Sequence, residues 1–209
     1  VRIKEFKEMF MAYNNADIEI IMDVVYNHMY GVSGSSFDKI LPGYYFRYKN
    51  DGSLWNGSGC GNEVASDHSM VRKYILDSVK FWVKEYNLSG FRFDLMGLID
   101  VHTMNQLAVE LHKIDPNIVI YGEPWTGGST GLDSSLKADK SNVSKLNGVG
   151  MFNDDLRDGI KGDTNGTGNG WIQGGGILSN VTAGLKGLGL GANPQKQVTY
   201  ITCHDNLAL

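Results

Sequence analysis

The chain repeats one pattern: an apolar run fit for a buried strand gives way to charged or polar side chains. Ile18–Val25 is followed at once by Tyr-Asn-His28, and the run that starts at Ile118 ends in Glu123. Amphipathic helical patterns separate these runs, and strands that alternate with helices form parallel sheets. Because the carboxyl ends of parallel strands share one edge, where barrel enzymes keep their active sites, the repeat predicts an α/β fold with a polar edge.

Three helices and three more strands complete the expected order. Apolar residues at helical spacing predict helices around 3–13, 71–86 and 104–114. Thr103 and Gln106 have the spacing of a capping box for the third helix, which Pro116 closes. Further strands are expected at 89–94, 150–155 and 197–202, with a weak helix near 177–188.

One of these strands, Ser89-Gly-Phe-Arg-Phe-Asp94, carries charge inside an apolar setting. Strand side chains alternate, so Phe91 and Phe93 point to one side and Arg92 and Asp94 to the other. An unpaired buried charge costs several kcal/mol. Two explanations stay open, an internal Arg92–Asp94 ion pair that holds the strand end, or a polar pocket where Asp94 does chemistry and Arg92 keeps it ionised.

Composition narrows the class of protein. The chain has 209 residues, 42% hydrophobic and 20% charged, which is ordinary for one soluble core. Its net charge of -4 argues against a nucleic-acid partner, which usually needs a basic surface. No apolar run approaches the roughly 18 residues of a membrane-spanning helix. The chain opens at Val1 inside an amphipathic pattern, so we expect a fragment of a longer protein.

Two long stretches lack strand or helix patterns. Residues 159–193 are rich in Gly and Asn, and residues 31–68 carry a dense aromatic set. A structureless loop of this length is uncommon and tends to be functional. Its aromatics either form a small core of their own or stack on sugar rings. The set comprises Phe37, Tyr44, Tyr45, Phe46, Tyr48 and Trp55.

The strand ends together supply carboxylates, histidines and one arginine, and two mechanisms fit them. The residues are Asp23, His28, Arg92, Asp94, Glu123, His204 and Asp205. Each of these residues alone also has a structural explanation. His28 can be a histidine at a helix edge whose hydrogen bonds are satisfied, and Asp205 can cap a turn. In the first mechanism, a metal among Asp23, His28, His204 and Asp205 hydrolyses a phosphate ester, although the spacings match no compact ligand motif.

In the second mechanism, Asp94 and Glu123 are the carboxylate pair of a glycosidase. One attacks the anomeric carbon, and the other protonates the leaving oxygen and later activates water; retention requires the two carboxyls to lie about 5–5.5 Å apart. Arg92 would keep Asp94 ionised. Glu123, beside Trp125 and away from cations, is expected to hold its proton, since desolvation favours the neutral carboxyl.

The chain carries four ordered segments at these strand ends: Asp23-Val-Val-Tyr-Asn-His28, Gly90-Phe-Arg-Phe-Asp94, Gly122-Glu-Pro-Trp125 and Thr202-Cys-His-Asp-Asn206. They resemble the signatures of the α-amylase superfamily, glycoside hydrolase family 13. The finer pattern is similar to type I pullulanases, the starch-debranching members, in the Glu-Pro-Trp of the third segment and in Gly57–Glu63 and Phe152–Lys161.

The resemblance implies a role for each matching residue. It makes Asp94 the nucleophile, Glu123 the general acid/base and Asp205 the carboxylate that grips the sugar at the cleavage site. Arg92 would orient Asp94, Asp23 would support the site, and His28 and His204 would bind the same sugar. Trp125 is placed with the substrate-binding residues. The implied partner is an α-glucan with α-1,6 branches. No cofactor is assigned; Asn27 stands where many amylases bind calcium, without a commitment to a metal.

The resemblance also implies a (β/α)8 barrel that is incomplete here. Five strands are expected, matching the third to seventh of eight, so residues 1–209 would be part of one catalytic domain. An open arc exposes unpaired edges, and we expect the isolated fragment to be unstable and inactive. Two rival functions remain, an α-1,4-acting amylase and a non-catalytic glucan-binding relative; compartment and oligomeric state carry no prediction.

Overall fold

The computed structural model describes residues 1–191 and 194–205, so Asn206 of the fourth signature segment and positions 192–193 of the Gly-rich stretch lie outside it. The chain divides into two units, Val1–Val149 (unit 1) and Gly150–Leu209 (unit 2). Within each unit the strands pair in parallel. The predicted α/β class with parallel strands is therefore confirmed. Its assignment to part of a barrel stays a prediction.

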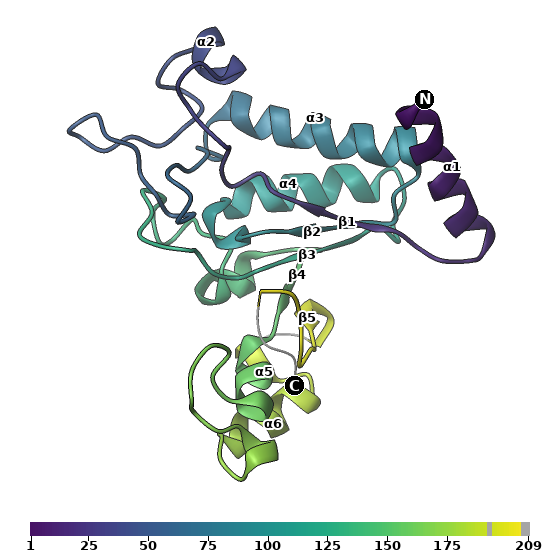
Figure 1. The fold of residues 1–209 in the computed structure, drawn as a ribbon, viewed down its shortest axis with the longest axis vertical. Coiled ribbons are helices and arrows are strands. Elements are labelled where there is room, and N and C mark those ends of the chain that lie inside the picture. The colour runs from purple at the N-terminus through teal and green to yellow at the C-terminus, as the bar shows by residue number, and fades with distance from the viewer. Residues whose placement is uncertain (192–193, 206–209) are drawn as a thin grey trace. The chain divides into compact units, whose positions relative to one another are not determined.

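Unit 1 contains a three-stranded sheet in the order β1-β2-β3 (Figure 1). Its strands are β1 (Ile21–Val24), β2 (Gly90–Phe93) and β3 (Val119–Gly122). The register pairs Asp23 with Arg92 and Phe93 with Gly122. The strands thus end level with one another, and the residues that follow them meet at one edge.

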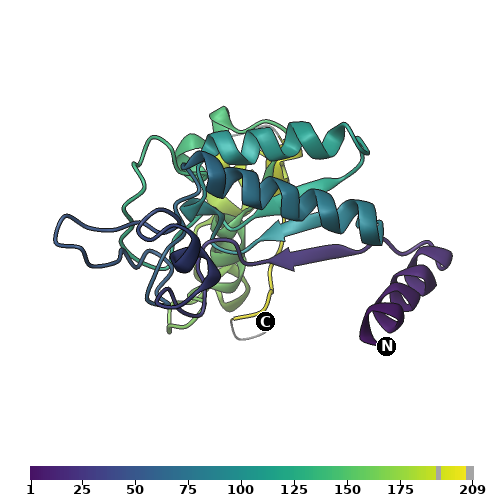
Figure 2. The ribbon, with the colours of Figure 1, turned by 90° about the horizontal axis from the view of Figure 1, so that it is seen from above.

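Two long helices cover one face of this sheet, and a third lies at its amino-terminal side (Figures 1 and 2). They are α3 (Ser69–Tyr86), α4 (Val101–His112) and α1 (Arg2–Asn15). The first two bury the apolar stripe that the sequence predicts, and Phe91 and Phe93 of β2 are fully buried. Each such side chain contributes about 1.5–3 kcal/mol of transfer free energy. Phe6 and Phe10 of α1 pack against Tyr86 of α3.

Helix α4 begins earlier than the capping box of Thr103 and Gln106 predicts. The first helical residue of α4 is Val101, and Asp100 is its N-cap. Asp100 accepts hydrogen bonds from the backbone N–H and the hydroxyl of Thr103. Thr103 is therefore a partner of the cap, and its interpretation as the cap is wrong.

The long stretches of unit 1 have little regular structure. Residues 31–68 contain the short helix α2 (Ser36–Ile40) and two isolated antiparallel bridges, Phe46–Val64 and Tyr48–Leu54. The 3₁₀ turns η1 (Met96–Leu98) and η2 (Lys140–Lys145) follow β2 and β3 respectively along the chain. Gly97 of η1 donates to the backbone oxygen of Glu123, and Val64 donates to that of Asn27, so η1 and the stretch 31–68 both contact the polar edge.

Unit 2 pairs β4 (Gly150–Phe152) with β5 (Gln197–Val198) and packs two helices together. The helices α5 (Asp154–Lys161) and α6 (Leu178–Leu185) share a small core of Leu156, Ile160 and Val181. A Cβ at Gly184 would lie 2.6 Å from the Leu156 Cβ, so glycine allows this close approach. The remaining 3₁₀ turns are η3 (Trp171–Gln173), η4 (Gly189–Gly191) and η5 (Pro194–Lys196).

Two predictions for unit 2 need correction. The expected strand at 197–202 ends at Val198, because β4 offers only three residues before Asn153 caps α5. Helix α5 occupies residues for which a strand end and a loop were predicted. In the described part of the chain, no helix is both long and apolar enough to cross a membrane.

Candidate active site

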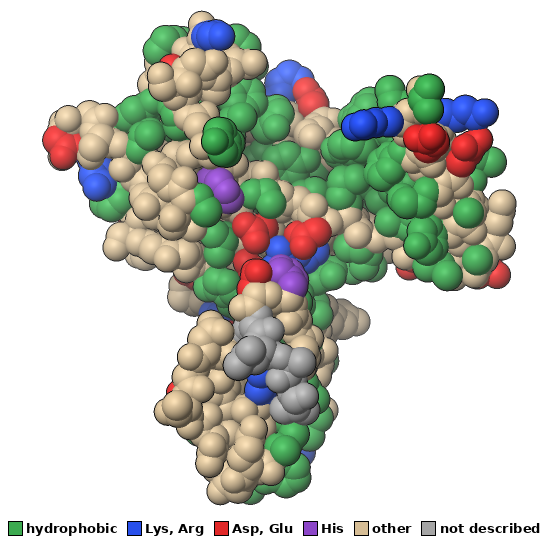
Figure 3. Space-filling view, viewed as in Figure 1, with side chains coloured by type: hydrophobic (Ala, Val, Ile, Leu, Met, Phe, Trp, Pro, Cys, Tyr) green, Lys and Arg blue, Asp and Glu red, His purple; other side chains and the backbone are tan. Residues whose placement is uncertain are grey.

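A buried guanidinium forms the centre of the polar edge of unit 1. Arg92 lies in β2, is 5% exposed and faces carboxylates from all three strands. Its Nη1 donates to Asp23 Oδ1 at 2.9 Å and to Asp94 Oδ1 at 3.2 Å. Its Nη2 donates to Glu123 Oε1. Figure 3 shows acidic side chains gathered around a basic group on one face of this unit. The predicted convergence of these four residues is therefore observed.

The charges of this group explain how an arginine can be buried here. Burial lowers the pKa of the Arg92 guanidinium, but the hydrogen bond with Asp23 and the negative charges around it outweigh that effect, so the pKa lies above its ordinary value. A buried charge is tolerated when partners satisfy it. The Arg92–Asp94 ion pair of the first explanation is thus present, as one contact in a wider polar cluster. The second explanation, that Asp94 does chemistry there, stays a prediction.

The contact with Glu123 corrects one expectation. The sequence placed Glu123 away from cations, whereas it forms an ion pair with Arg92 in unit 1. Spacing along the chain does not indicate this ion pair, because Arg92 lies in β2 whereas Glu123 follows β3. The Arg92 guanidinium therefore contacts both Asp94 and Glu123 in the structure.

Glu123 is also held by the backbone that leaves β2. It is 8% exposed, and its Oε2 accepts a 2.8 Å hydrogen bond from the N–H of Leu95. Its backbone oxygen accepts from the N–H of Gly97 at 3.1 Å. Leu95 has a φ of 40°, in the left-handed region that costs energy for a side chain with a Cβ. Such strain is found at positions that the surrounding structure determines closely.

Asp94 is fixed from the side of β1. Its backbone N–H donates to Val24 O at 3.0 Å. The Nδ2 of Asn27 donates to the backbone oxygen and to Oδ2 of Asp94, each at 2.8 Å. His28 Nδ1 lies 2.6 Å from Asn27 Oδ1. The sequence singled out His28 and missed this role for Asn27, although its place between two predicted site residues was a signal.

These contacts bear on the metal mechanism. Asp23 faces the Arg92 guanidinium, and His28 faces the Asn27 amide. The first two residues of the predicted metal set therefore point to different partners, and the carboxylates of unit 1 surround a cation that the chain itself supplies. The Asn27 Oδ1 likewise faces a histidine nitrogen, which does not fit a calcium ligand directed at an open coordination sphere.

Several aromatic side chains of residues 31–68 pack against one another. Phe37 and Tyr45 stack with ring centroids 4.4 Å apart, and Tyr44 contacts Tyr45 edge to face. Trp55 has Lys49 Nζ over its ring at 5.3 Å, and a Cβ at Gly131 would lie 2.5 Å from the same ring. These contacts support the explanation of a small aromatic core. The alternative, that these aromatic side chains stack on sugar rings, stays a prediction.

A buried carboxylate joins this stretch to the loop after β3. Glu63 is 0% exposed, and its Oε1 accepts from Thr130 Oγ1 at 2.8 Å and from Gly131 N at 2.9 Å. Its Oε2 accepts from Gly57 N at 2.7 Å, and Arg47 Nη1 lies 3.4 Å from Oε1. Through these hydrogen bonds, Glu63 links the loop that follows Trp125 in the chain to residues 57–63. In the sequence, this role of Glu63 is indicated only by one acidic residue that follows a run of small residues.

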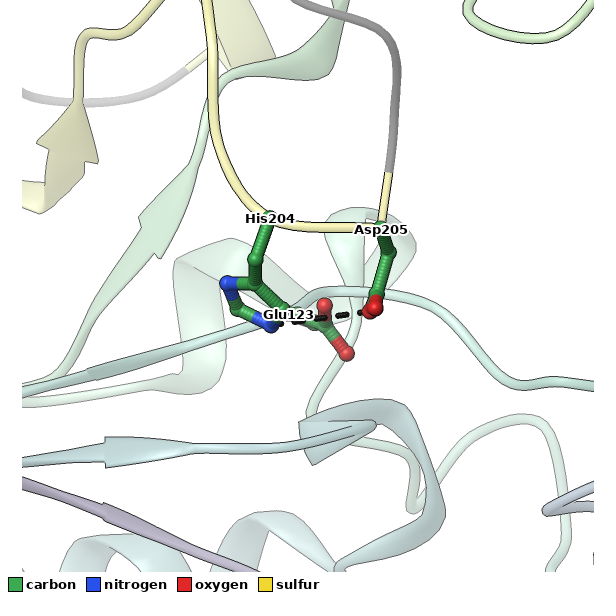
Figure 4. Close-up of side chains that lie close together, drawn as sticks. All are labelled: Glu123, His204 and Asp205. Atoms are coloured by element: carbon green, nitrogen blue, oxygen red, sulfur yellow. Dashed lines mark ion pairs between the residues drawn. The ribbon is translucent and has the colours of Figure 1, made fainter.

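The other predicted site residues lie in less constrained places. Trp125 is half-buried in unit 1. In unit 2, His204 Nε2 lies 3.5 Å from Asp205 Oδ2, both side chains are exposed, and Asp205 has a φ of 68° (Figure 4). Cys203 Sγ lies 3.2 Å from His204 Nδ1. Whether His204 and Asp205 join the other site residues stays a prediction.

The geometry defines a class before any comparison. Carboxylates that follow neighbouring parallel strands are held around one guanidinium and by backbone N–H groups at the carboxyl edge of the sheet. α/β enzymes place their active sites at this edge. Unit 1 therefore has the form of an α/β protein with a preorganised carboxylate site.

In comparisons with known proteins, the chain is similar to pullulanases. The chain is 36% identical over 98% of its length to a pullulanase of Bacillus subtilis (strain 168), covering 30% of that protein. It is 39% identical to pullulanase 1, chloroplastic, of Arabidopsis thaliana, with 77% of this chain and 18% of that protein matched. No protein-family model matches the chain.

A solved structure gives the same result for the fold. The pullulanase of Paenibacillus barengoltzii in complex with maltohexaose and α-cyclodextrin matches with a TM-score of 0.93 at 43% identity, covering 99% of this chain and 33% of that one. The chain is thus homologous to a segment of pullulanases. It spans 30% or less of the length of the two curated relatives described.

Proposed function

We propose that the full-length protein is a retaining glycoside hydrolase of the α-amylase superfamily that cuts α-1,6 branch linkages in pullulan, amylopectin or limit dextrins. In this proposal the chain supplies the third to seventh strands of a (β/α)8 barrel. The observation that carries it is the shared clamp on Asp94 and Glu123, which Arg92 contacts together. Homology to pullulanases over nearly the whole chain supports the substrate class.

The first chemical step uses the two clamped carboxylates. An oxygen of Asp94 forms a bond to the anomeric carbon while the bond from that carbon to the leaving oxygen breaks, and Glu123 gives its proton to that oxygen. Arg92 donates to Asp94 Oδ1 and holds the carboxylate in place. Glu123 must be protonated at this step, and the loss of water when a glucan fills the site favours the neutral carboxyl.

The second step releases the sugar. Glu123, now ionised, takes a proton from water as the water oxygen bonds to the anomeric carbon, and the bond to Asp94 breaks. Two inversions at the same carbon retain its configuration. The remaining roles are those that the resemblance implies: Asp23 supports the site, Asp205 grips sugar hydroxyls, and His28, His204 and Trp125 bind the same substrate.

The test is reducing-sugar release from pullulan by the full-length protein and by an Asp94→Asn variant. We expect the variant to lose at least about a thousandfold, or roughly 4 kcal/mol of transition-state stabilisation. Asp77→Asn is the matched control, because Asp77 pairs with Lys73 on the exposed face of α3. Cutting of amylose with pullulan intact would favour the α-1,4-acting rival. Saturable glucan binding with no cutting would favour the non-catalytic one.

A further inference from the structure

Asn27 is buried between two of the predicted site residues and uses all of its side-chain polar groups there. It is 1% exposed. Both hydrogens of its amide nitrogen have acceptors on Asp94, the backbone oxygen and Oδ2, each 2.8 Å away. Its Oδ1 faces His28 Nδ1 at 2.6 Å. Because the amide donates to both the backbone oxygen and Oδ2 of Asp94, it fixes the orientation of the carboxylate.

The same contacts determine which nitrogen of His28 carries hydrogen. Both partners of the Asn27 nitrogen are oxygen acceptors, so the amide must present NH₂ to Asp94 and its oxygen to His28. An oxygen accepts and cannot donate, so the hydrogen lies on His28 Nδ1. In the neutral ring this leaves Nε2 as an acceptor. A sugar hydroxyl can donate to such a nitrogen.

Asn27 is itself held by the stretch around Glu63. Its backbone oxygen accepts from Val64 N at 2.8 Å. Two residues further on, Met29 exchanges hydrogen bonds with the Asn62 side chain at 3.0 and 2.7 Å. The segment after β1 therefore has a fixed backbone, and the position of the Asn27 amide follows from it.

We propose that Asn27 is a positioning residue that sets the orientation of the Asp94 carboxylate and the tautomer of His28. The inference rests on the proposed function. It goes further by assigning a role to a residue that acts through Asp94 and His28 rather than on the substrate. It predicts an effect on the chemical step that is separate from the effect on stability.

The experiment compares Asn27→Ala and Asn27→Asp with Asn142→Ala in the full-length protein. Asn142 is a matched control in unit 1, because it is 5% exposed and its amide donates to the backbone oxygens of Ser134 and Lys137. Asn27→Asp keeps the size of the side chain, loses both donors and sets a second carboxylate beside Asp94, so it tests whether the amide donors, rather than the volume of the side chain, hold Asp94. The readouts are kcat and KM on pullulan, and the melting temperature.

We expect both Asn27 variants to lose about 10- to 100-fold in kcat, the range of a hydrogen bond to a charged group, with KM within about threefold of the wild type. Asn142→Ala should lower the melting temperature and keep the wild-type kcat. A kcat within about threefold of the wild type in both Asn27 variants, or an equal kcat loss in Asn142→Ala, would overturn the inference alone. A wild-type protein that leaves pullulan intact would overturn the proposed function and this role with it.

Discussion

The backbone N–H of Leu95 donates to Glu123 Oε2 at 2.8 Å, so the residue that follows Asp94 in the chain holds the other carboxylate of the proposed pair. Arg92, two residues before Asp94, holds the opposite oxygen of Glu123. One short segment of β2 and its exit loop therefore fixes both carboxylates at once. Such preorganisation places charged groups before the substrate arrives, which is the main electrostatic device of enzymes.

Replacing Arg92 by lysine should separate charge from geometry. Two nitrogens of the guanidinium reach three carboxylates, and a single ammonium cannot reproduce this fork. We expect Arg92→Lys to lower kcat on pullulan by about 100-fold and the free energy of unfolding by about 1–3 kcal/mol. Kinetics and urea unfolding of the full-length protein measure the two effects. Arg2→Lys, on the exposed start of α1, serves as the control. Wild-type kcat in Arg92→Lys would mean that charge alone suffices.

Gly97 tests how closely the exit loop of β2 approaches the loop after β3. A Cβ at this position would lie 2.5 Å from the backbone oxygen of Trp125, so one backbone must move. Overpacking of this kind costs about 1–3 kcal/mol. Because Gly97 N also donates to the Glu123 oxygen, we expect Gly97→Ala to reduce both the melting temperature and kcat.

Gly31→Ala is the matched control for that substitution. A Cβ at Gly31 meets no atom within 4 Å, so this variant should melt and turn over like the wild type. Equal behaviour of the two alanine variants would show that the strand-exit loop adapts at no cost.

Much of unit 1 follows from patterns within single segments. The helical stripe of α3 and the alternation of Phe91, Arg92 and Phe93 are local properties, and parallel pairing brings the strand ends together. The Arg92–Glu123 ion pair does not follow, because the spacing between two strands says nothing about which carboxylate a guanidinium faces. The expectation that Glu123 lies away from cations was wrong for this reason.

The other misses have physical causes of the same kind. Asp100 and Thr103 can both cap α4, and the carboxylate wins because its two oxygens take both the N–H and the hydroxyl of Thr103. The apolar run at 197–202 is long enough for a strand, but β5 extends only as far as its short partner β4. A strand is defined by its neighbour, which the run itself does not contain.

Glu63→Gln should weaken the link between the loop after β3 and residues 57–63. Both carboxylate oxygens accept from N–H or O–H donors, so the NH₂ of glutamine must face a donor whichever way it turns. Leaving buried donors unsatisfied costs about 1–3 kcal/mol, and more beside a charge. Urea unfolding should show this loss. The control is Asp51→Asn, whose exposed carboxylate accepts from Ser53, and its unfolding curve should stay close to that of the wild type. A Glu63→Gln midpoint equal to this control would contradict the prediction.

Tyr26 should make the protein lose stability at alkaline pH. Burial raises the pKa of its phenol to about 12, against the smaller opposing effect of the hydrogen bond with Ser78. Above about pH 10, the ordinary tyrosine value, the unfolded chain loses this proton while the folded chain keeps it. The unfolded state then binds fewer protons, so the free energy of unfolding falls as pH rises from 10 to 12. Two pKa units correspond to about 2.7 kcal/mol.

Two variants isolate this contribution from that of other tyrosines. Tyr26→Phe removes the ionisable group, so its unfolding free energy should fall by about 2–3 kcal/mol less than that of the wild type between pH 9 and pH 12. Ser78→Ala removes the 2.7 Å hydrogen bond that lowers the pKa of Tyr26 but leaves the phenol buried, so its alkaline loss should equal or exceed that of the wild type. Denaturant unfolding at stepped pH measures all three proteins. Identical slopes in wild type and Tyr26→Phe would mean that the Tyr26 phenol ionises equally in the folded and unfolded states.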